Sequence, residues 1–203
     1  MFSPKIILWG GVASVFGGLF WMITGLAPSG GDATLTLALV LSLGGLVGLY
    51  SQKARQSGIL GLAGFALGVI GTAVALAGFW RPERELTRLA QTLLVGSLGL
   101  LTLGIGLALL GVVSLPGKTL LRWRGLPLTL GLLNILLSIS IWLIFYMPLS
   151  RGQNPFDPWT PTAYLPVFAL FVLIGLGWIG LGTTLAAEGD AQIPVAQNPS
   201  ASA

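Results

Sequence analysis

Six apolar stretches, each about as long as a membrane-spanning helix, dominate this chain of 203 residues. A helix that crosses the hydrocarbon core of a bilayer needs about 20 apolar residues. Charged residues make up only 8% of the chain, against about 25% in an ordinary soluble domain, so they are too few to cover a soluble fold. We therefore predict an all-α, polytopic transmembrane bundle of six membrane-spanning helices.

The predicted helices cover about residues 6–26, 34–51, 59–80, 89–114, 127–147 and 162–187, and form one transmembrane domain over residues 1–187. The fourth is expected to begin near Pro82, because proline suits a first helical turn, and to project from the membrane. Pro148 is expected to stop the fifth, because proline breaks a helix interior. Residues 188–203 have no apolar period and are predicted to be a disordered tail.

The chain contains no His and no Cys. This excludes His-ligated haem and zinc sites, Ser-His-Asp and Cys-His catalysis, and disulfides. No charged residue lies inside a predicted span, which argues against a proton-coupled pump and a charge-ringed pore. We predict no cofactor, no metal and no catalytic residue. The basic pI comes from Lys and Arg in short loops, which is typical of membrane topology and not of nucleic-acid binding.

Small residues form stripes along several predicted helices, and such stripes let helix backbones approach closely in lipid. The third helix has the spacing 3-4-3-4-3 in its stripe, which is Gly61, Gly64, Gly68, Gly71, Ala75 and Gly78. The first helix carries the shorter set Gly10, Ser14 and Gly18. In the last helix, glycines cover more than one face: Gly175, Gly177, Gly180 and Gly182. We interpret these residues as helix-packing positions.

Asn134 is the strongest polar group at depth, and Ser138 lies four residues later on the same helix face. Thr102 on the fourth helix is predicted to meet them. A buried amide needs partners, so an interhelical hydrogen bond is expected. The alternative is a contact with a polar ligand.

The seven Trp residues fit the aromatic belt of a membrane protein in part. Trp9 lies near a predicted interface, as do Trp80, Trp123 and Trp159, and Trp21 lies near the outer end of the first helix. Trp142 and Trp178 lie deeper, where we expect them to pack.

The loops predict an orientation with both termini in the cytoplasm, because six Lys and Arg fall on that side and four on the other. On the inner side, we expect contacts with anionic lipid headgroups from five residues: Lys53, Arg55, Lys118, Arg122 and Arg124. The outer side gathers Asp32, Glu83, Glu85 and Asp157 with four Arg residues. A solvated, salt-bridged surface is the expected role of this face, and a membrane enzyme site is the alternative.

The segment that begins with Trp-Gly-Gly-Val-Ala at residues 9–13 and runs through Gly48 to Trp80 resembles uncharacterised six-helix integral membrane proteins of bacteria. The resemblance implies a multi-pass protein of the bacterial cytoplasmic membrane. It transfers no functional residues.

The sequence therefore favours a non-catalytic accessory, scaffold or assembly component that packs against itself or a membrane-protein partner. A channel or facilitator for a small neutral or lipidic solute is the first alternative. A membrane enzyme that uses the outer carboxylates is the second.

Overall fold

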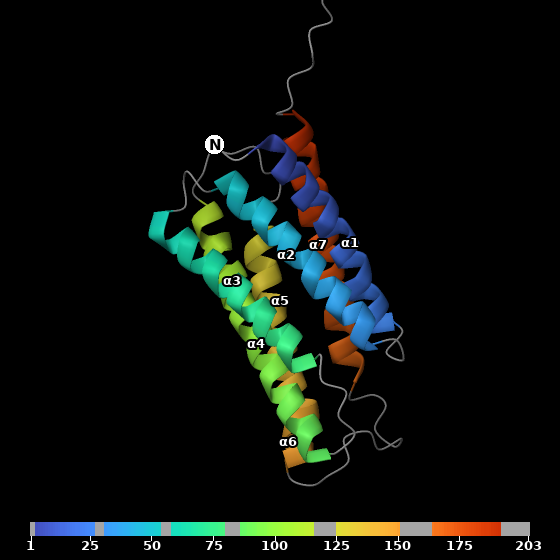
Figure 1. Cartoon of the computed structure of the whole chain (residues 1–203). Helices are drawn as coiled ribbons and strands as arrows, with labels where there is room; N and C mark the ends of the chain where they lie inside the picture. The colour runs from blue at the N-terminus through green and yellow to red at the C-terminus, as the bar shows by residue number, and fades with distance from the viewer. Residues whose placement is uncertain are drawn as a thin grey trace, which may run out of the picture.

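The chain folds into long α-helices, as the computed structural model in Figure 1 shows. The structure describes residues 3–26, 31–53, 58–79, 86–115, 125–150 and 164–191. The helices are α1 (Pro4–Leu26), α2 (Gly31–Lys53), α3 (Gly58–Phe79), α4 (Leu86–Ser114), α5 (Leu126–Ile141), α6 (Met147–Ser150) and α7 (Leu165–Ala191). A π-helical turn, Trp142–Tyr146, joins α5 to α6. Within these ranges, six helical segments are long and apolar enough to cross a membrane. The predicted fold class is confirmed, and the fold is that of a multi-pass membrane protein.

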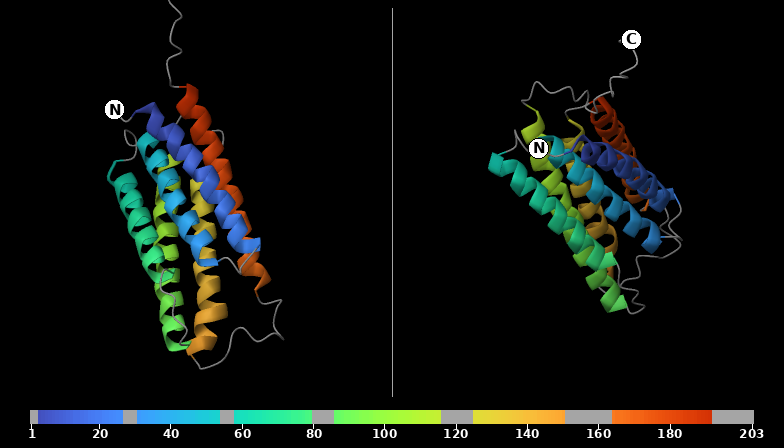
Figure 2. Two further views of the ribbon diagram at one scale, coloured as in Figure 1. Left: turned by 45° about the vertical axis from the view of Figure 1, so that its right-hand side comes forward. Right: turned by 45° about the horizontal axis from the view of Figure 1, so that its top comes forward.

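Consecutive long helices run in alternating directions through the bundle (Figures 1 and 2). After six passes the chain returns to its starting side, so the beginning of α1 and the end of α7 lie at the same end of the bundle (Figure 1). Gly58, which begins α3, has φ +49°. Glycine adopts this left-handed conformation without steric cost, so it suits the first position of α3.

The bundle consists of two three-helix units. In the first unit α1 packs closely against α2 and α7, and in the second unit α4 packs closely against α3 and α5. The units meet where α2 contacts α3 and α5 contacts α7. The close pairings lie within the units, and the contacts between the units are less extensive.

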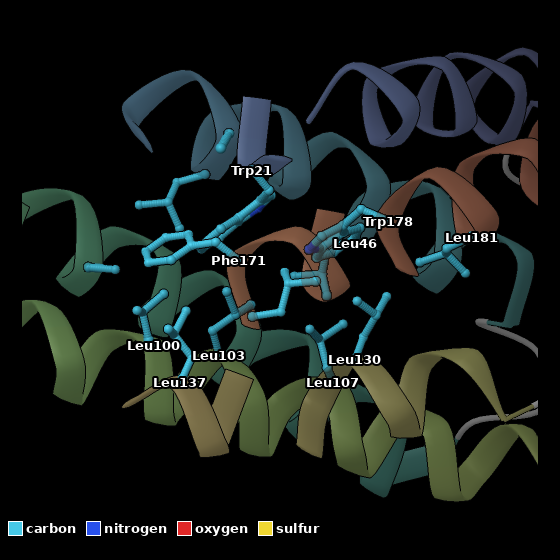
Figure 3. Packing of buried hydrophobic residues seen from close by; sticks show 14 of the residues in the cluster. Trp21, Leu46, Leu100, Leu103, Leu107, Leu130, Leu137, Phe171, Trp178 and Leu181 are labelled. Carbon is cyan, nitrogen blue, oxygen red and sulfur yellow. The ribbon is translucent and has the colours of Figure 1, made fainter. Parts of the chain in front are cut away.

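Large apolar side chains fill the space between the two units, and we call this cluster the interunit core. Figure 3 shows Trp21, Phe171 and Trp178 of the first unit lying opposite leucines of α4 and α5. The fully or almost fully buried leucines of the second unit are Leu100, Leu103, Leu107, Leu110, Leu130 and Leu137. A single apolar cluster therefore holds the units together.

The fifth apolar span ends at Tyr146, close to the predicted boundary, but Pro148 does not stop the helical backbone as predicted. The backbone N–H of Met147 donates to the carbonyl of Trp142, five residues earlier, and α6 then continues through Pro148 to Ser150. Proline removes one backbone donor and crowds the carbonyl of the preceding turn. The wider π turn directly before Pro148 relieves this crowding, which a local reading of the sequence does not reveal.

The last span continues beyond the predicted boundary at residue 187. Helix α7 ends at Ala191, so residues 188–191 are helical and the predicted disordered tail begins at least four residues too early. Gly189 is buried, and a Cβ placed on it would lie 2.6 Å from the backbone nitrogen of Leu8. Packing against the start of α1 therefore supports a helical turn that lacks an apolar period.

Helix α2 begins at Gly31, three residues before its predicted start, and α4 begins at Leu86. The predicted start near Pro82 and residues 192–203 of the predicted tail lie outside the described residues.

Two of the tryptophans differ from their predicted surroundings. Trp21 is completely buried, and its indole N–H donates to the Ser42 hydroxyl at 3.0 Å. Trp142 was predicted to pack inside the bundle, but it is 38% exposed. A tryptophan at a helix end reaches the core when a neighbouring helix offers an acceptor, and only the helix arrangement determines this. Trp80, Trp123 and Trp159 lie outside the described residues.

Candidate functional site

The glycine stripe of α3 faces two neighbours. A Cβ added to Gly64 would lie 2.9 Å from the Gly106 carbonyl oxygen, and one added to Gly78 would lie 2.6 Å from the Gly96 Cα, both on α4. Gly71 and Ala75 also approach the α4 backbone, and Gly61 is buried. Gly68 faces the side chain of Leu46 on α2. The stripe therefore packs mainly against α4 and also receives a leucine from the other unit.

The set Gly10, Ser14 and Gly18 on α1 does not form one packing face. Gly10 approaches Gly48 of α2, with 2.6 Å between an added Cβ and the Gly48 Cα. Gly18 instead approaches Gly175 of α7. Ser14 lies between these contacts, and its hydroxyl donates to the Trp178 carbonyl of α7 at 2.8 Å. The predicted single stripe therefore divides between two partners.

A repeat of seven residues explains this division. The glycines of α1 that face α7 are Gly11, Gly18 and Gly25, and those of α7 that face α1 are Gly175, Gly182 and Gly189. Seven residues are close to two helical turns, so each series stays on one face. We call this contact the α1/α7 glycine seam. A search for glycines seven residues apart would have found it in the sequence.

Gly177 and Gly180 of α7 have a different role from the seam glycines. A Cβ on Gly177 would meet the side chain of Leu130 at 2.6 Å, and one on Gly180 would meet that of Leu126 at 3.4 Å. Both neighbours belong to α5, in the other unit. The glycines of α7 thus cover two faces, one toward a backbone and one toward leucine side chains.

The structure separates the three residues predicted to form a polar contact. The Thr102 hydroxyl donates to the Leu98 carbonyl of its own helix at 2.8 Å and meets neither of the others. Ser138 instead donates across the helix interface to the Ser97 carbonyl of α4 at 2.6 Å. Ser138 thus finds its partner on the fourth helix, as predicted, but the partner is Ser97 and not Thr102, five residues further along. The sequence did not indicate Ser97. Nothing in the spacing of one helix reveals the register against its neighbour.

Asn134 makes a hydrogen bond only within its own helix. Its side-chain N–H donates to the Leu130 carbonyl at 2.8 Å, and its Oδ1 is buried with no donor among the described residues. Trp178 lacks the opposite kind of partner, because its buried indole N–H has no acceptor among the described residues. A buried polar group without a partner costs about 1–3 kcal/mol. These two atoms are therefore the least satisfied polar groups of the interunit core.

A groove of about 230 Å³ lies between α4 and α5, and its polar floor consists of Ser97 and Ser138. Its walls include the exposed side chains Leu98, Ile139 and Trp142. The Ser97 hydroxyl donates to the Leu94 carbonyl at 2.9 Å, so both serines already use their protons on the backbone. The groove opens on the outer side of the bundle, and its two serines can offer a ligand only acceptor oxygens.

The predicted lipid-contact residues fall at or beyond the ends of the described segments. Lys53 is the last residue of α2, and its side chain is not described. The other four lie outside the described residues: Arg55, Lys118, Arg122 and Arg124. The side chains of Asp32, Glu83, Glu85 and Asp157 are likewise outside them.

Among the side chains that the structure describes, the charged ones are Lys5, Glu188 and Asp190. They lie in the first turn of α1 and the last turns of α7, and hence at one end of the bundle. No group of three acidic residues is found in the described part of the chain. In the part of the chain that the structure describes, the interior of the bundle thus contains packing residues, hydroxyl groups and the Asn134 amide.

The chain was also compared with known proteins. No protein-family model matches it, and neither a curated protein nor a solved structure matches it significantly. The assignment as a multi-pass membrane protein therefore rests on the chain itself, which forms six long apolar helices.

Proposed function

We propose that this chain is a non-catalytic accessory, scaffold or assembly component of a membrane. The observation that carries the proposal is the filled interunit core. Trp21, Trp178 and Leu107 are completely buried there, together with the other large side chains of the cluster. A transport path or an active site needs space and polar groups at depth, whereas a scaffold needs a stable body.

The outer surface of the bundle is apolar, as a membrane scaffold requires. Large side chains point outward on every unit, for example Leu62 of α3 and Leu173 of α7, which are 54% and 48% exposed. Lipid tails cover such side chains without cost, and a neighbouring helix can replace them. Association with a second copy or with another membrane protein would use these faces.

A facilitator for a small neutral or lipidic solute is the second candidate. The groove floored by Ser97 and Ser138 favours it, since this groove brings hydroxyl oxygens to an apolar surface. Its volume of about 230 Å³ lies on one side of the bundle, and the buried leucines of the interunit core lie behind it. The packing thus supports the scaffold more than the facilitator.

Photo-crosslinking in native membranes tests the proposal, and the absence of Cys makes single labels possible. We expect a crosslinker on Leu62→Cys, Leu132→Cys or Leu173→Cys to give a discrete protein adduct from at least one face. As a control, dilution of the purified variant into excess lipid should abolish a partner adduct. Lipid adducts alone at all three positions, with faster glycerol entry into proteoliposomes, would instead support the facilitator.

We also propose a bacterial cytoplasmic membrane with both termini inside, in accord with the resemblance and the loop charges. Ser3 and Asp190 are exposed at the same end of the bundle. Single cysteines at these two positions should react with a membrane-impermeant maleimide in inverted vesicles and not in intact cells. Labelling of intact cells would reverse the orientation.

A further inference from the structure

A groove of about 370 Å³ lies on the outer surface of α1 and α2 at the end of the bundle where the chain begins. Its lining consists of Lys5, Ile6, Trp9, Gly10, Gly44 and Val47. All of these are apolar except Lys5, and neither serine hydroxyls nor acidic groups enter the lining. The groove is therefore a different place from the one floored by Ser97 and Ser138.

Two glycines, Gly10 and Gly44, line the groove beside the contact between α1 and α2. Gly10 meets the α2 backbone closely on one side, which brings the two helices together. A Cβ added to Gly44 would lie 2.8 Å from the Ala13 Cβ, and no further atom of a neighbouring helix is described within 4 Å of it. The remaining space beside Gly44 is open, and Trp9, which is 67% exposed, stands as a wall above it. The result is an apolar trough with an aromatic edge.

The charge of the groove lies at the depth of a lipid headgroup. Lys5 is the second residue of α1 and begins the first membrane span, whereas Gly10 lies five residues further in. At a rise of about 1.5 Å per residue, the backbone of Gly10 thus lies about 8 Å further into the span than that of Lys5. Lysine at a span end extends its ammonium to the interface, and tryptophan prefers the same level. The positive end of the α1 dipole also lies here and favours an anion.

We propose that this groove binds one anionic phospholipid, with an acyl chain against Gly10, Gly44 and Val47 and the phosphate beside Lys5. Charge complementarity selects the anionic headgroup, because Lys5 is the charged residue of the lining. The acidic residues of this end, Glu188 and Asp190, belong to α7 and do not line the groove. The apolar trough favours an acyl chain. Free phosphate has no acyl chain, so it would make only the contact with Lys5.

Native mass spectrometry of the full chain tests this proposal, with phosphatidylglycerol and phosphatidylcholine of equal chain length as probes. The wild type should retain one phosphatidylglycerol in preference to phosphatidylcholine. Lys5→Gln should reduce this preference about fivefold, the factor that corresponds to one interfacial lysine. Lys5→Arg should keep it, and inorganic phosphate should not displace the lipid.

A second variant tests the trough without touching a buried contact. Val47 is 37% exposed, so Val47→Phe can fill the groove, and Val40, one repeat of seven earlier on α2 and 49% exposed, gives the matched control Val40→Phe. Val47→Phe should lower retention of both lipids severalfold, whereas Val40→Phe should match the wild type. Equal retention in Lys5→Gln, Val47→Phe and the wild type would overturn the proposal. A dimer that Val47→Phe dissociates would also overturn it, because a second copy would then occupy the groove.

Discussion

The contacts within each three-helix unit differ in kind from the contacts between the units. Within a unit, glycines bring two backbones together, as Gly11 and Gly182 do in the α1/α7 glycine seam. Between units, large side chains form one cluster, to which Trp178 and Leu107 contribute from opposite sides (Figure 3). In lipid, apolar side chains gain little by leaving the solvent, because the solvent is also apolar. The glycine contacts should therefore tolerate less change than the leucine contacts.

The largest effect is expected from an added methyl group in the seam. In Gly182→Ala, the new Cβ would lie 2.5 Å from the Gly11 carbonyl oxygen and 2.7 Å from the Val15 nitrogen. Both atoms belong to a backbone, so the helices must separate, at a cost of about 3 kcal/mol. Unfolding in mixed detergent micelles with increasing dodecyl sulfate measures this loss.

Gly180→Ala is the matched control for that prediction, because Gly180 lies on the same helix two residues away. Its new Cβ would lie 3.4 Å from a Leu126 methyl group, which is ordinary contact. Alanine also improves helix propensity, so the stability should stay level or rise by up to about 1 kcal/mol. Equal losses in both variants would contradict the distinction between backbone seams and side-chain contacts.

A smaller loss is expected from truncation in the interunit core. Leu107→Ala removes most of a completely buried side chain. Because the unfolded chain in a membrane is also surrounded by apolar groups, mainly the cavity cost remains, about 1–2 kcal/mol. The same micelle titration measures it. A loss larger than that of Gly182→Ala would reverse the order of the two regions.

The interhelical hydrogen bonds should contribute less than either kind of packing. Ser14→Ala removes the donor to the Trp178 carbonyl, and Ser138→Ala removes the donor to the Ser97 carbonyl. Hydrogen bonds between membrane helices average about 0.6 kcal/mol. Each variant should lose about this much in the titration, and Thr102→Ala, whose hydroxyl bonds within its own helix, is the control.

An effect of the opposite sign is expected at Asn134. Asn134→Leu replaces a buried amide whose Oδ1 has no donor among the described residues by an apolar side chain of similar size. Removing an unsatisfied polar atom should leave stability unchanged or raise it by up to about 1 kcal/mol. A marked loss of folding would show that Oδ1 has a partner in the membrane. A folded variant with altered solute entry into proteoliposomes would point to transport.

Some of the contacts that these variants test depend on one helix alone, and others depend on the position of neighbouring helices. The α3 stripe was recognisable in the sequence because its residues share one face of one helix. The division of Gly10 and Gly18 between α2 and α7 was not, because it depends on where two other helices lie. The same reason explains Thr102, which lies on α4 as predicted but at the wrong register to meet Asn134.

By itself, the sequence determined the membrane class, the six spans and the absence of charge at depth, since apolar length and composition are properties of single segments. Only the tertiary structure decided which glycines form seams, which serines pair, that α7 continues through Gly189, and that the chain passes Pro148 through a π turn. These features depend on the distance between atoms far apart in the chain. In a bilayer, where hydrophobicity no longer drives helix association, that distance determines which contacts stabilise the fold.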